Sequence, residues 1–279
     1  ATSTPLVQTW YARSRGSAMP YRLYAFSNAG SLAALLCYPV LVEPYLSLRS
    51  QTMAWSAGYV VYAVLAGALA LAGYGQRAAV SPGLRTAESP ATPPGWGRRL
   101  LWVALAGCAS ALLLASTNLL TEDVAPVPFL WILPLGLYLA SFILCFAHGP
   151  WYSSRLFGWL VTPALFGLAF VMIYSRSGAN LVLTATLLCG GLFVCCMFCH
   201  GELAKLRPEP AFLTRFYLMV ALGGALGGAL AALAAPHLFV EYFEFPITLA
   251  LCACLAWTLT PRSTASLIRL GLTLALVGY

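Results

Sequence analysis

The 279-residue chain is 61% hydrophobic and 8% charged, with a mean hydropathy of +0.82 and a formal net charge of +7. Soluble globular domains carry about 25% charged residues, so this composition excludes a soluble protein. It predicts an all-α, polytopic transmembrane helical bundle that contacts the lipid bilayer and has no nucleic-acid partner. Nearly every charge is expected in a loop or at a helix end, where its position indicates topology.

Segment 1–20 is polar, basic and aromatic, so we expect it at headgroup level on the cytoplasmic side. Residues 21–279 are predicted to form the bundle, with a hydrophilic cytoplasmic loop at 75–99. Apolar runs bounded by charges and prolines predict about eight spans and a partial ninth. The predicted spans are Tyr21–Val42, Met53–Tyr74, Leu100–Leu120, Phe129–Phe146, Leu156–Tyr174, Asn180–Cys199, Phe216–Ala235 and Ile247–Leu259, followed by Leu267–Tyr279. Segment 236–259 either spans the membrane at a tilt or is re-entrant, because its apolar run is short.

The basic residues separate between the two predicted faces. Alternating the loops places thirteen Lys and Arg residues on the face of the N-terminus, and only Arg49 and Arg176 on the other. The positive-inside rule therefore predicts a cytoplasmic N-terminus. By the same alternation, the charged turn His200–Arg215 is expected to be cytoplasmic.

The opposite face holds five of the eight acidic residues. They are Glu43, Glu122, Asp123, Glu241 and Glu244. A cleft lined with one sign of charge concentrates counter-ions, so these carboxylates could form a vestibule for cations. The alternative is that they are merely what the positive-inside rule leaves on the outer face.

Two polar patches lie within predicted spans. Ser27, Asn28 and Ser31 belong to the first span, and Thr117 and Asn118 to the outer end of the third. Polar groups in lipid find partners across helices, so helix–helix hydrogen bonding is the first interpretation and a substrate pathway the second.

Small residues repeat at helical spacing in the predicted seventh span. Gly223 and Gly227 form one Gly-x-x-x-Gly pair, and Gly224 and Gly228 form another. This pattern is typical of close helix packing in membranes. It predicts contacts with a neighbouring helix, including helices of other membrane subunits.

Cys196, Cys199 and His200 match the C-x-x-C-H pattern that attaches a c-type haem. The predicted topology places this motif at the cytoplasmic end of the sixth span, whereas that haem is attached in the oxidising compartment. We therefore reject haem and expect His200 at the membrane interface. All nine cysteines lie in apolar runs, where free Cys behaves as a small hydrophobe, so no metal or other cofactor is predicted.

Several ordered motifs resemble the membrane half of the bacterial fused major-facilitator/spermidine-synthase-like proteins. The resemblance covers about residues 1–246. Its motifs are Tyr21–Ser31 (YRLYAFSNAGS), Tyr38–Pro44 (YPVLVEP), Trp55–Tyr59 (WSAGY), Thr121–Pro134, Cys199–Ala204 (CHGELA) and Phe216–Leu218 leading to Gly223 and Gly224. It implies a transporter-like, major-facilitator-like bundle in the bacterial inner membrane, followed in the family by a cytoplasmic aminopropyltransferase-like domain.

The chain departs from that family at both ends. It starts at Ala1 without Met and stops at Tyr279 within an apolar run, so both ends are expected to be cut or processed. It has no glycine-rich loop after a strand, and none of the aspartates that an aminopropyltransferase uses, so no catalytic residue is carried over and no enzyme is expected. Two functions remain: a transporter-like module for polyamines or other small cations, and a non-catalytic accessory subunit of a larger respiratory or photosynthetic complex.

Overall fold

The computed structural model describes residues 20–79, 93–124, 128–147, 151–175, 180–209, 212–238, 243–260 and 271. Within these ranges every regular element is a helix, which confirms the all-α class. Six helices are long and apolar enough to cross a membrane, and two further apolar helices are shorter. The chain is therefore a multi-pass membrane protein with lipid-facing helices. Segment 1–19 and nearly all of the predicted ninth span lie outside the described residues.

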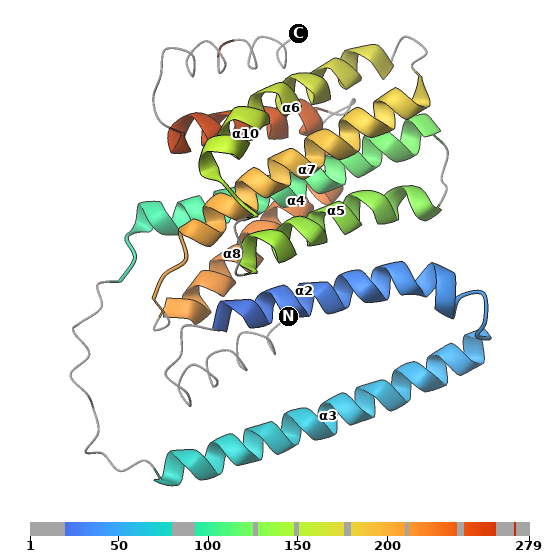
Figure 1. The fold of residues 1–279 in the computed structure, drawn as a ribbon, viewed down its shortest axis with the longest axis vertical. Helices are drawn as coiled ribbons and strands as arrows, with labels where there is room; N and C mark the ends of the chain where they lie inside the picture. The colour runs from blue at the N-terminus through green and yellow to red at the C-terminus, as the bar shows by residue number, and fades with distance from the viewer. Residues whose placement is uncertain are drawn as a thin grey trace. The chain divides into compact units, whose positions relative to one another are not determined.

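The helices follow one another along the chain (Figure 1). Their bounds are α2 Pro20–Cys37, η1 Tyr38–Val42, α3 Leu48–Ala79, α4 Trp96–Val124, α5 Pro128–Phe146, α6 Ser154–Ser175, α7 Leu181–Lys205, α8 Leu213–Ala229, η3 Leu230–Ala234, α9 Ala235–Leu238 and α10 Glu244–Leu259. The two shorter apolar helices are Leu130–Phe146, within α5, and α10. The structure thus supports six spans by length and hydropathy, fewer than the eight predicted.

The chain divides into two compact units. The smaller unit, Ala33–Pro93, contains η1 and α3. Pro39 lacks a backbone donor, and the helix passes it as a π-turn closed by the bond from the Glu43 amide to the Tyr38 carbonyl, 2.9 Å long. The Tyr38 hydroxyl then donates to Oε1 of Gln51, 3.1 Å away, which ties the turn to the start of α3.

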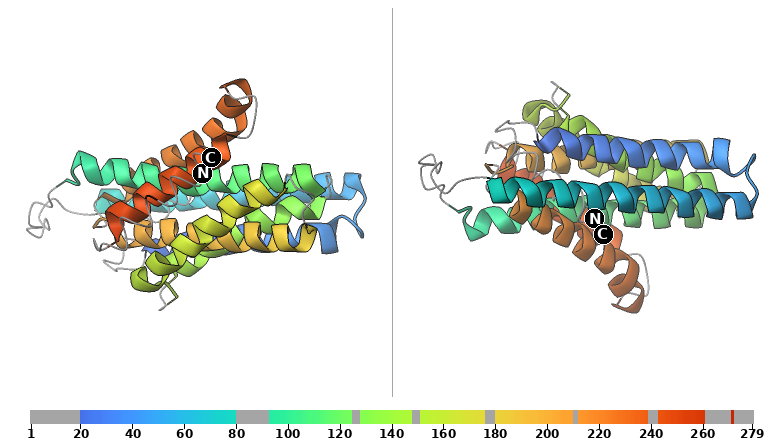
Figure 2. Two further views of the ribbon diagram at one scale, coloured as in Figure 1. Left: turned by 90° about the horizontal axis from the view of Figure 1, so that it is seen from above. Right: turned by 90° about the horizontal axis from the view of Figure 1, so that it is seen from below.

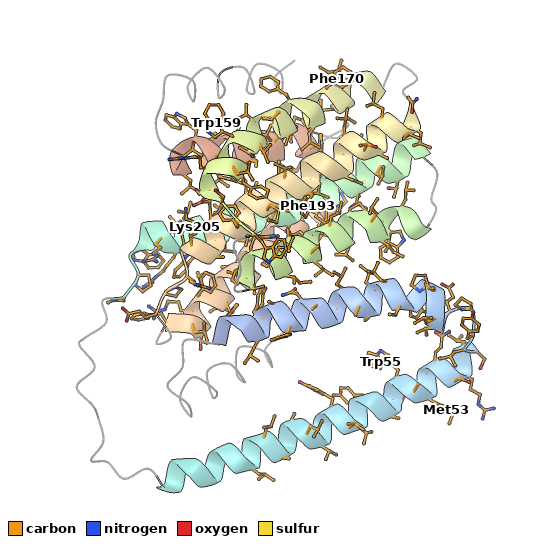
Figure 3. All side chains as sticks on the ribbon, viewed as in Figure 1. Met53, Trp55, Trp159, Phe170, Phe193 and Lys205 are labelled. Atoms are coloured by element: carbon orange, nitrogen blue, oxygen red, sulfur yellow. The ribbon has the colours of Figure 1, made fainter. Side chains whose placement is uncertain are left out.

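The larger unit comprises Ala1–Leu32 and Pro94–Tyr279 and holds the buried core. Helix α4 packs against α5, α7, α8 and α10, while α7 packs against α4, α5 and α6. Trp102 of α4 is fully buried and meets Phe216 of α8 edge to face, with ring centroids 5.1 Å apart. Large side chains on the outside of α6, such as Trp159 and Phe170, are exposed (Figure 3), as expected for a surface that faces lipid.

Glycines allow α8 to cross α4 at backbone contact (Figure 2). A Cβ atom at Gly227 would collide with the carbonyl oxygen of Gly107, and one at Gly223 would collide with that of Val103. Gly224, one position round the helix, has nothing within 4 Å of such a Cβ. The Gly223 and Gly227 face of α8 is thus used inside this chain, against α4.

Helix α7 runs further than the predicted sixth span, which ended at Cys199. It starts at an N-cap, Asn180, whose Oδ1 accepts from the Val182 amide at 3.0 Å, and it continues through Lys205. Beyond Lys205, the Leu206 carbonyl accepts from Nε1 of Trp102, 3.1 Å away, and from the guanidinium of Arg98. These α4 donors satisfy the carbonyl that follows the last residue of α7. Because α7 continues to Lys205, His200 lies within the helix and not in a turn.

Candidate functional site

His200 is enclosed by α5 and has no exposed surface, contrary to the expectation of an interfacial residue. Its ring stacks on Phe142 with centroids 3.6 Å apart and meets Tyr138 edge to face at 4.9 Å. Nδ1 lies 2.8 Å from Oγ of Ser141. Burial is tolerated because aromatic rings cover the imidazole and a hydroxyl satisfies one of its nitrogens.

The hydrogen-bond network assigns the tautomer of His200. The single hydroxyl hydrogen of Ser141 is donated to the Tyr138 carbonyl, 2.7 Å away. Nδ1 of His200 therefore donates to Oγ of Ser141, and Nε2 carries the lone pair. Nε2 is buried and has no hydrogen-bond partner among the described residues, so it is an available acceptor inside the bundle.

Glu202 is the second ionisable residue buried on α7, with 5% of its surface exposed. Its Oε1 accepts from the hydroxyl of Tyr152 at 2.7 Å and from that of Ser154 at 2.5 Å. Nζ of Lys205 lies 3.3 Å away, but the Lys205 side chain is half exposed (Figure 3). The two hydroxyl donors, both from the segment that begins α6, therefore provide most of the support for this carboxylate.

Gly201 makes room for this arrangement. A Cβ atom at Gly201 would overlap the ring of Tyr152, so only glycine lets that ring lie against the helix. Tyr152 also stacks on Phe157 with centroids 5.4 Å apart. The sequence His200-Gly201-Glu202 thus combines a buried base, a gap for an aromatic ring and a buried acid on one turn of α7.

Tyr152→Phe is expected to lower the free energy of unfolding by about 1.5 to 3 kcal/mol, the usual contribution of a hydrogen bond to a charged group. Burial and the bond to Glu202 raise the pKa of Tyr152 above its ordinary value near 10. Stability tied to Tyr152 is then fully present below pH 10 and is lost above it, as the unfolded tyrosine ionises while the folded one resists. Chemical denaturation in detergent at pH 8 and pH 10.5 measures both effects. An unchanged pH dependence in Tyr152→Phe would contradict the assignment.

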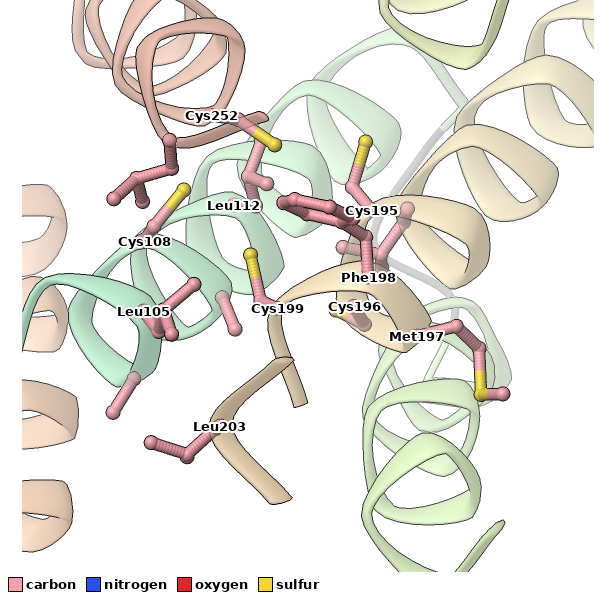
Figure 4. Close-up of a cluster of buried hydrophobic side chains, with 14 of the residues drawn as sticks. Leu105, Cys108, Leu112, Cys195, Cys196, Met197, Phe198, Cys199, Leu203 and Cys252 are labelled. Atoms are coloured by element: carbon pink, nitrogen blue, oxygen red, sulfur yellow. The ribbon is translucent and has the colours of Figure 1, made fainter. Parts of the chain in front are cut away.

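Three thiols from three different helices also meet in the core (Figure 4). The sulfur atoms of Cys108, Cys199 and Cys252 all lie within 4.8 Å of one another, and all three residues are buried. They are the residues of this site that could hold a metal ion. His200, which ends the haem-like motif, is packed under Phe142 instead.

The polar patches in α2 and α4 bond to their own helices. Nδ2 of Asn28 donates to the Tyr24 carbonyl at 2.8 Å, and Oγ of Ser31 to the Ser27 carbonyl at 3.2 Å. Oγ1 of Thr117 donates likewise to the carbonyl of Leu113, at 2.7 Å. These bonds satisfy the groups within one helix, as is common for Ser and Thr in apolar helices. Asn118 is half-buried beside them.

The structure bears on only part of the predicted vestibule. Glu43 is exposed and belongs to the smaller unit, while Glu244 belongs to the larger unit and is buried at the start of α10. The side chains of Glu122 and Asp123 and the whole of Glu241 lie outside the described residues. Among the carboxylates that the structure describes, Glu202 is the one with several side-chain partners. The charge pattern had placed Glu202 in a cytoplasmic turn.

A cavity of about 310 Å³ lies between α4, α5 and α7, towards the Leu181 end of α7. Its walls are apolar except for Thr186; they include Leu120, Leu130, Leu133 and Leu181. Such walls suit a hydrocarbon chain and offer no charged acceptor for an ammonium group.

Sequence reasoning missed the support for Glu202 and the thiol cluster. Tyr152 and Ser154 lie about fifty positions before Glu202, and no spacing rule connects them. The available signal was the Gly201-Glu202 pair in an otherwise apolar helix, because an acid inside a span needs a partner.

Comparison with known proteins adds no assignment: no family model, curated protein or solved structure matches the chain.

Proposed function

We propose that this chain is a transporter-like integral membrane module that moves a small organic cation such as a polyamine. The observation that carries the proposal is the pair of ionisable residues buried in one membrane-spanning helix, His200 and Glu202. Ionisable groups inside spans are costly, and where they persist they commonly mark substrate, ion or proton pathways.

The chemistry of the pair fits a cationic substrate. Glu202 is a carboxylate whose only charged partner in the described chain is the half-exposed Lys205, which an incoming ammonium group can replace. Tyr152 and Ser154 hold the carboxylate in place during such an exchange. Nε2 of His200 is a second buried acceptor on the same helix, on the side that faces α5. The resemblance to the major-facilitator-like half of the fused family supports the same class of function.

The test is uptake of radiolabelled spermidine into proteoliposomes that contain the purified chain. Glu202→Gln is expected to reduce uptake about 30-fold or more, because losing one partner of a buried charged pair costs about 2 kcal/mol or more. Glu209→Gln is the matched control, since Glu209 is exposed just beyond the same helix. Equal uptake by wild type, Glu202→Gln and protein-free liposomes would reject transport of this substrate.

A second candidate is a non-catalytic accessory subunit of a larger membrane complex. The observation that favours it is the apolar cavity beside Leu130 and Thr186, whose described lining suits a hydrocarbon chain better than a cation. Purification in a mild detergent distinguishes the two candidates. A chain that migrates alone and binds spermidine favours transport, whereas stoichiometric partner subunits favour the accessory role.

We further propose that the protein resides in a bacterial inner membrane with its N-terminus and the Lys205 end of α7 in the cytoplasm. The thirteen-to-two division of basic residues supports this orientation. Arg85→Cys should then resist labelling by a membrane-impermeant maleimide in intact cells and react after permeabilisation. Labelling from outside intact cells would reverse the topology.

A further inference from the structure

We propose that Cys108, Cys199 and Cys252 form a binding site for a single soft, thiol-preferring monovalent cation, Cu(I). The three sulfur atoms come from α4, α7 and α10 and converge on one point between these helices (Figure 4). Packing alone explains one small cysteine at a helix crossing. Here each of three helices places a thiol in the same space, and three such thiols can together coordinate one metal ion.

The spacing suits a three-coordinate metal. A thiolate–metal bond is about 2.3 Å long, so an ion in the plane of three sulfur ligands holds them about 4 Å apart. The sulfur atoms lie within 4.8 Å of one another, so small side-chain rotations bring all three to the ion. Cys108 retains such freedom, because the bond that it makes outside the cluster is a long one, to the Thr248 carbonyl at 3.9 Å.

The side chains that surround the thiols are apolar. Leu105, Leu112, Phe198 and Leu203 enclose the thiols and are fully buried apolar side chains. No His, Asp or Glu side chain joins the three thiols in the described part of the chain. Soft sulfur ligands without carboxylate or imidazole select Cu(I) over harder divalent ions, and zinc in proteins ordinarily takes four ligands.

Binding of Cu(I) is coupled to proton release. Cysteine binds a metal as the thiolate, so each thiol that coordinates Cu(I) releases its proton to the medium. Copper stays Cu(I) throughout, so the step needs no oxidant or reductant.

The experiment titrates Cu(I) anaerobically into the purified protein in lipid nanodiscs, with bicinchoninate as the competing chelator. Wild type is expected to take one Cu(I) per chain. Cys108→Ser, Cys199→Ser and Cys252→Ser should each weaken binding at least about 100-fold, because even changes outside the ligand shell cost 10- to 100-fold. Cys145→Ser is the matched control, since its thiol contacts Met197 on the α5 side of α7. It should bind as wild type does.

Three results would overturn the proposal: wild type binding no more Cu(I) than the triple serine variant, Cys145→Ser weakening binding as much as Cys199→Ser, or preferential uptake of Zn(II). Cys195 lies on the same face of α7, one turn away, and its sulfur points toward the cluster (Figure 4). An equal loss in Cys195→Ser would replace the three-coordinate site with a four-thiol one. Where a variant fails to fold, X-ray absorption spectroscopy of the wild-type Cu(I) complex tests the proposal instead. We expect three sulfur atoms bound to the copper ion.

Discussion

Gly227→Leu is expected to destabilise the bundle by about 3 kcal/mol or more. Helix α8 meets α4 at backbone contact, and the first side-chain atom at position 227 would already collide with the Gly107 carbonyl. Rotating a side chain cannot relieve a clash with backbone, so the helices must separate and lose the packing around Trp102 and Phe216. Overpacking of this kind usually costs about 1 to 3 kcal/mol, and backbone contact places this site at the upper end.

Gly224→Leu is the matched control for that prediction. It lies in the same helix and receives the same side chain, but an added Cβ there meets nothing within 4 Å. Its stability should change by less than about 1 kcal/mol, the difference in helix propensity between glycine and other residues. Thermal unfolding in detergent, followed by circular dichroism, measures both variants. Equal unfolding temperatures for the two would show that α4 and α8 are not in backbone contact.

The sequence carried enough information for the helices and for the small-residue face of α8. Long apolar runs in a chain with few charges can satisfy their backbone groups in lipid only as helices, and glycines four positions apart fall on one face. The helix that pairs with that face was not predictable, because the Gly107 and Val103 carbonyls carry no side-chain signal. Six of the eight predicted spans are supported by length among the described residues, because hydropathy alone does not separate a full span from a shorter apolar helix such as α10.

The interior of the candidate site depends on contacts between distant segments. Cys108, Cys199 and Cys252 are separated by 91 and 53 positions, so nothing in the local spacing distinguishes them from the other six cysteines. In the same way, His200 and Glu202 look like the start of a hydrophilic turn until Ser141 and Tyr152 are seen beside them. A polar residue near a helix end can lie at the membrane interface or in the core. Its hydrogen-bond partners, which come from distant segments, determine which of the two it is.

The variant Glu202→Ala tests whether Glu202 lies at the membrane interface or in the buried core. If Glu202 were an exposed anchor of a cytoplasmic turn, its loss would cost no more than the 0 to 1 kcal/mol of a surface ion pair. As a buried acceptor for Tyr152 and Ser154, it should cost about 3 to 5 kcal/mol, since two hydrogen bonds to a charged group are lost and two buried hydroxyls lose their acceptor.

Chemical denaturation in mixed micelles is the measurement, with Glu209→Ala as the matched control because Glu209 is exposed beyond the same helix. Glu209→Ala should stay within about 0.5 kcal/mol of wild type. A double variant, Glu202→Ala with Tyr152→Phe, should be less destabilised than the sum of its single changes, because both remove the same hydrogen bond. If Glu202→Ala were as stable as Glu209→Ala, Glu202 would have to be at the surface, and the buried acid on which the proposed transport pathway depends would not exist.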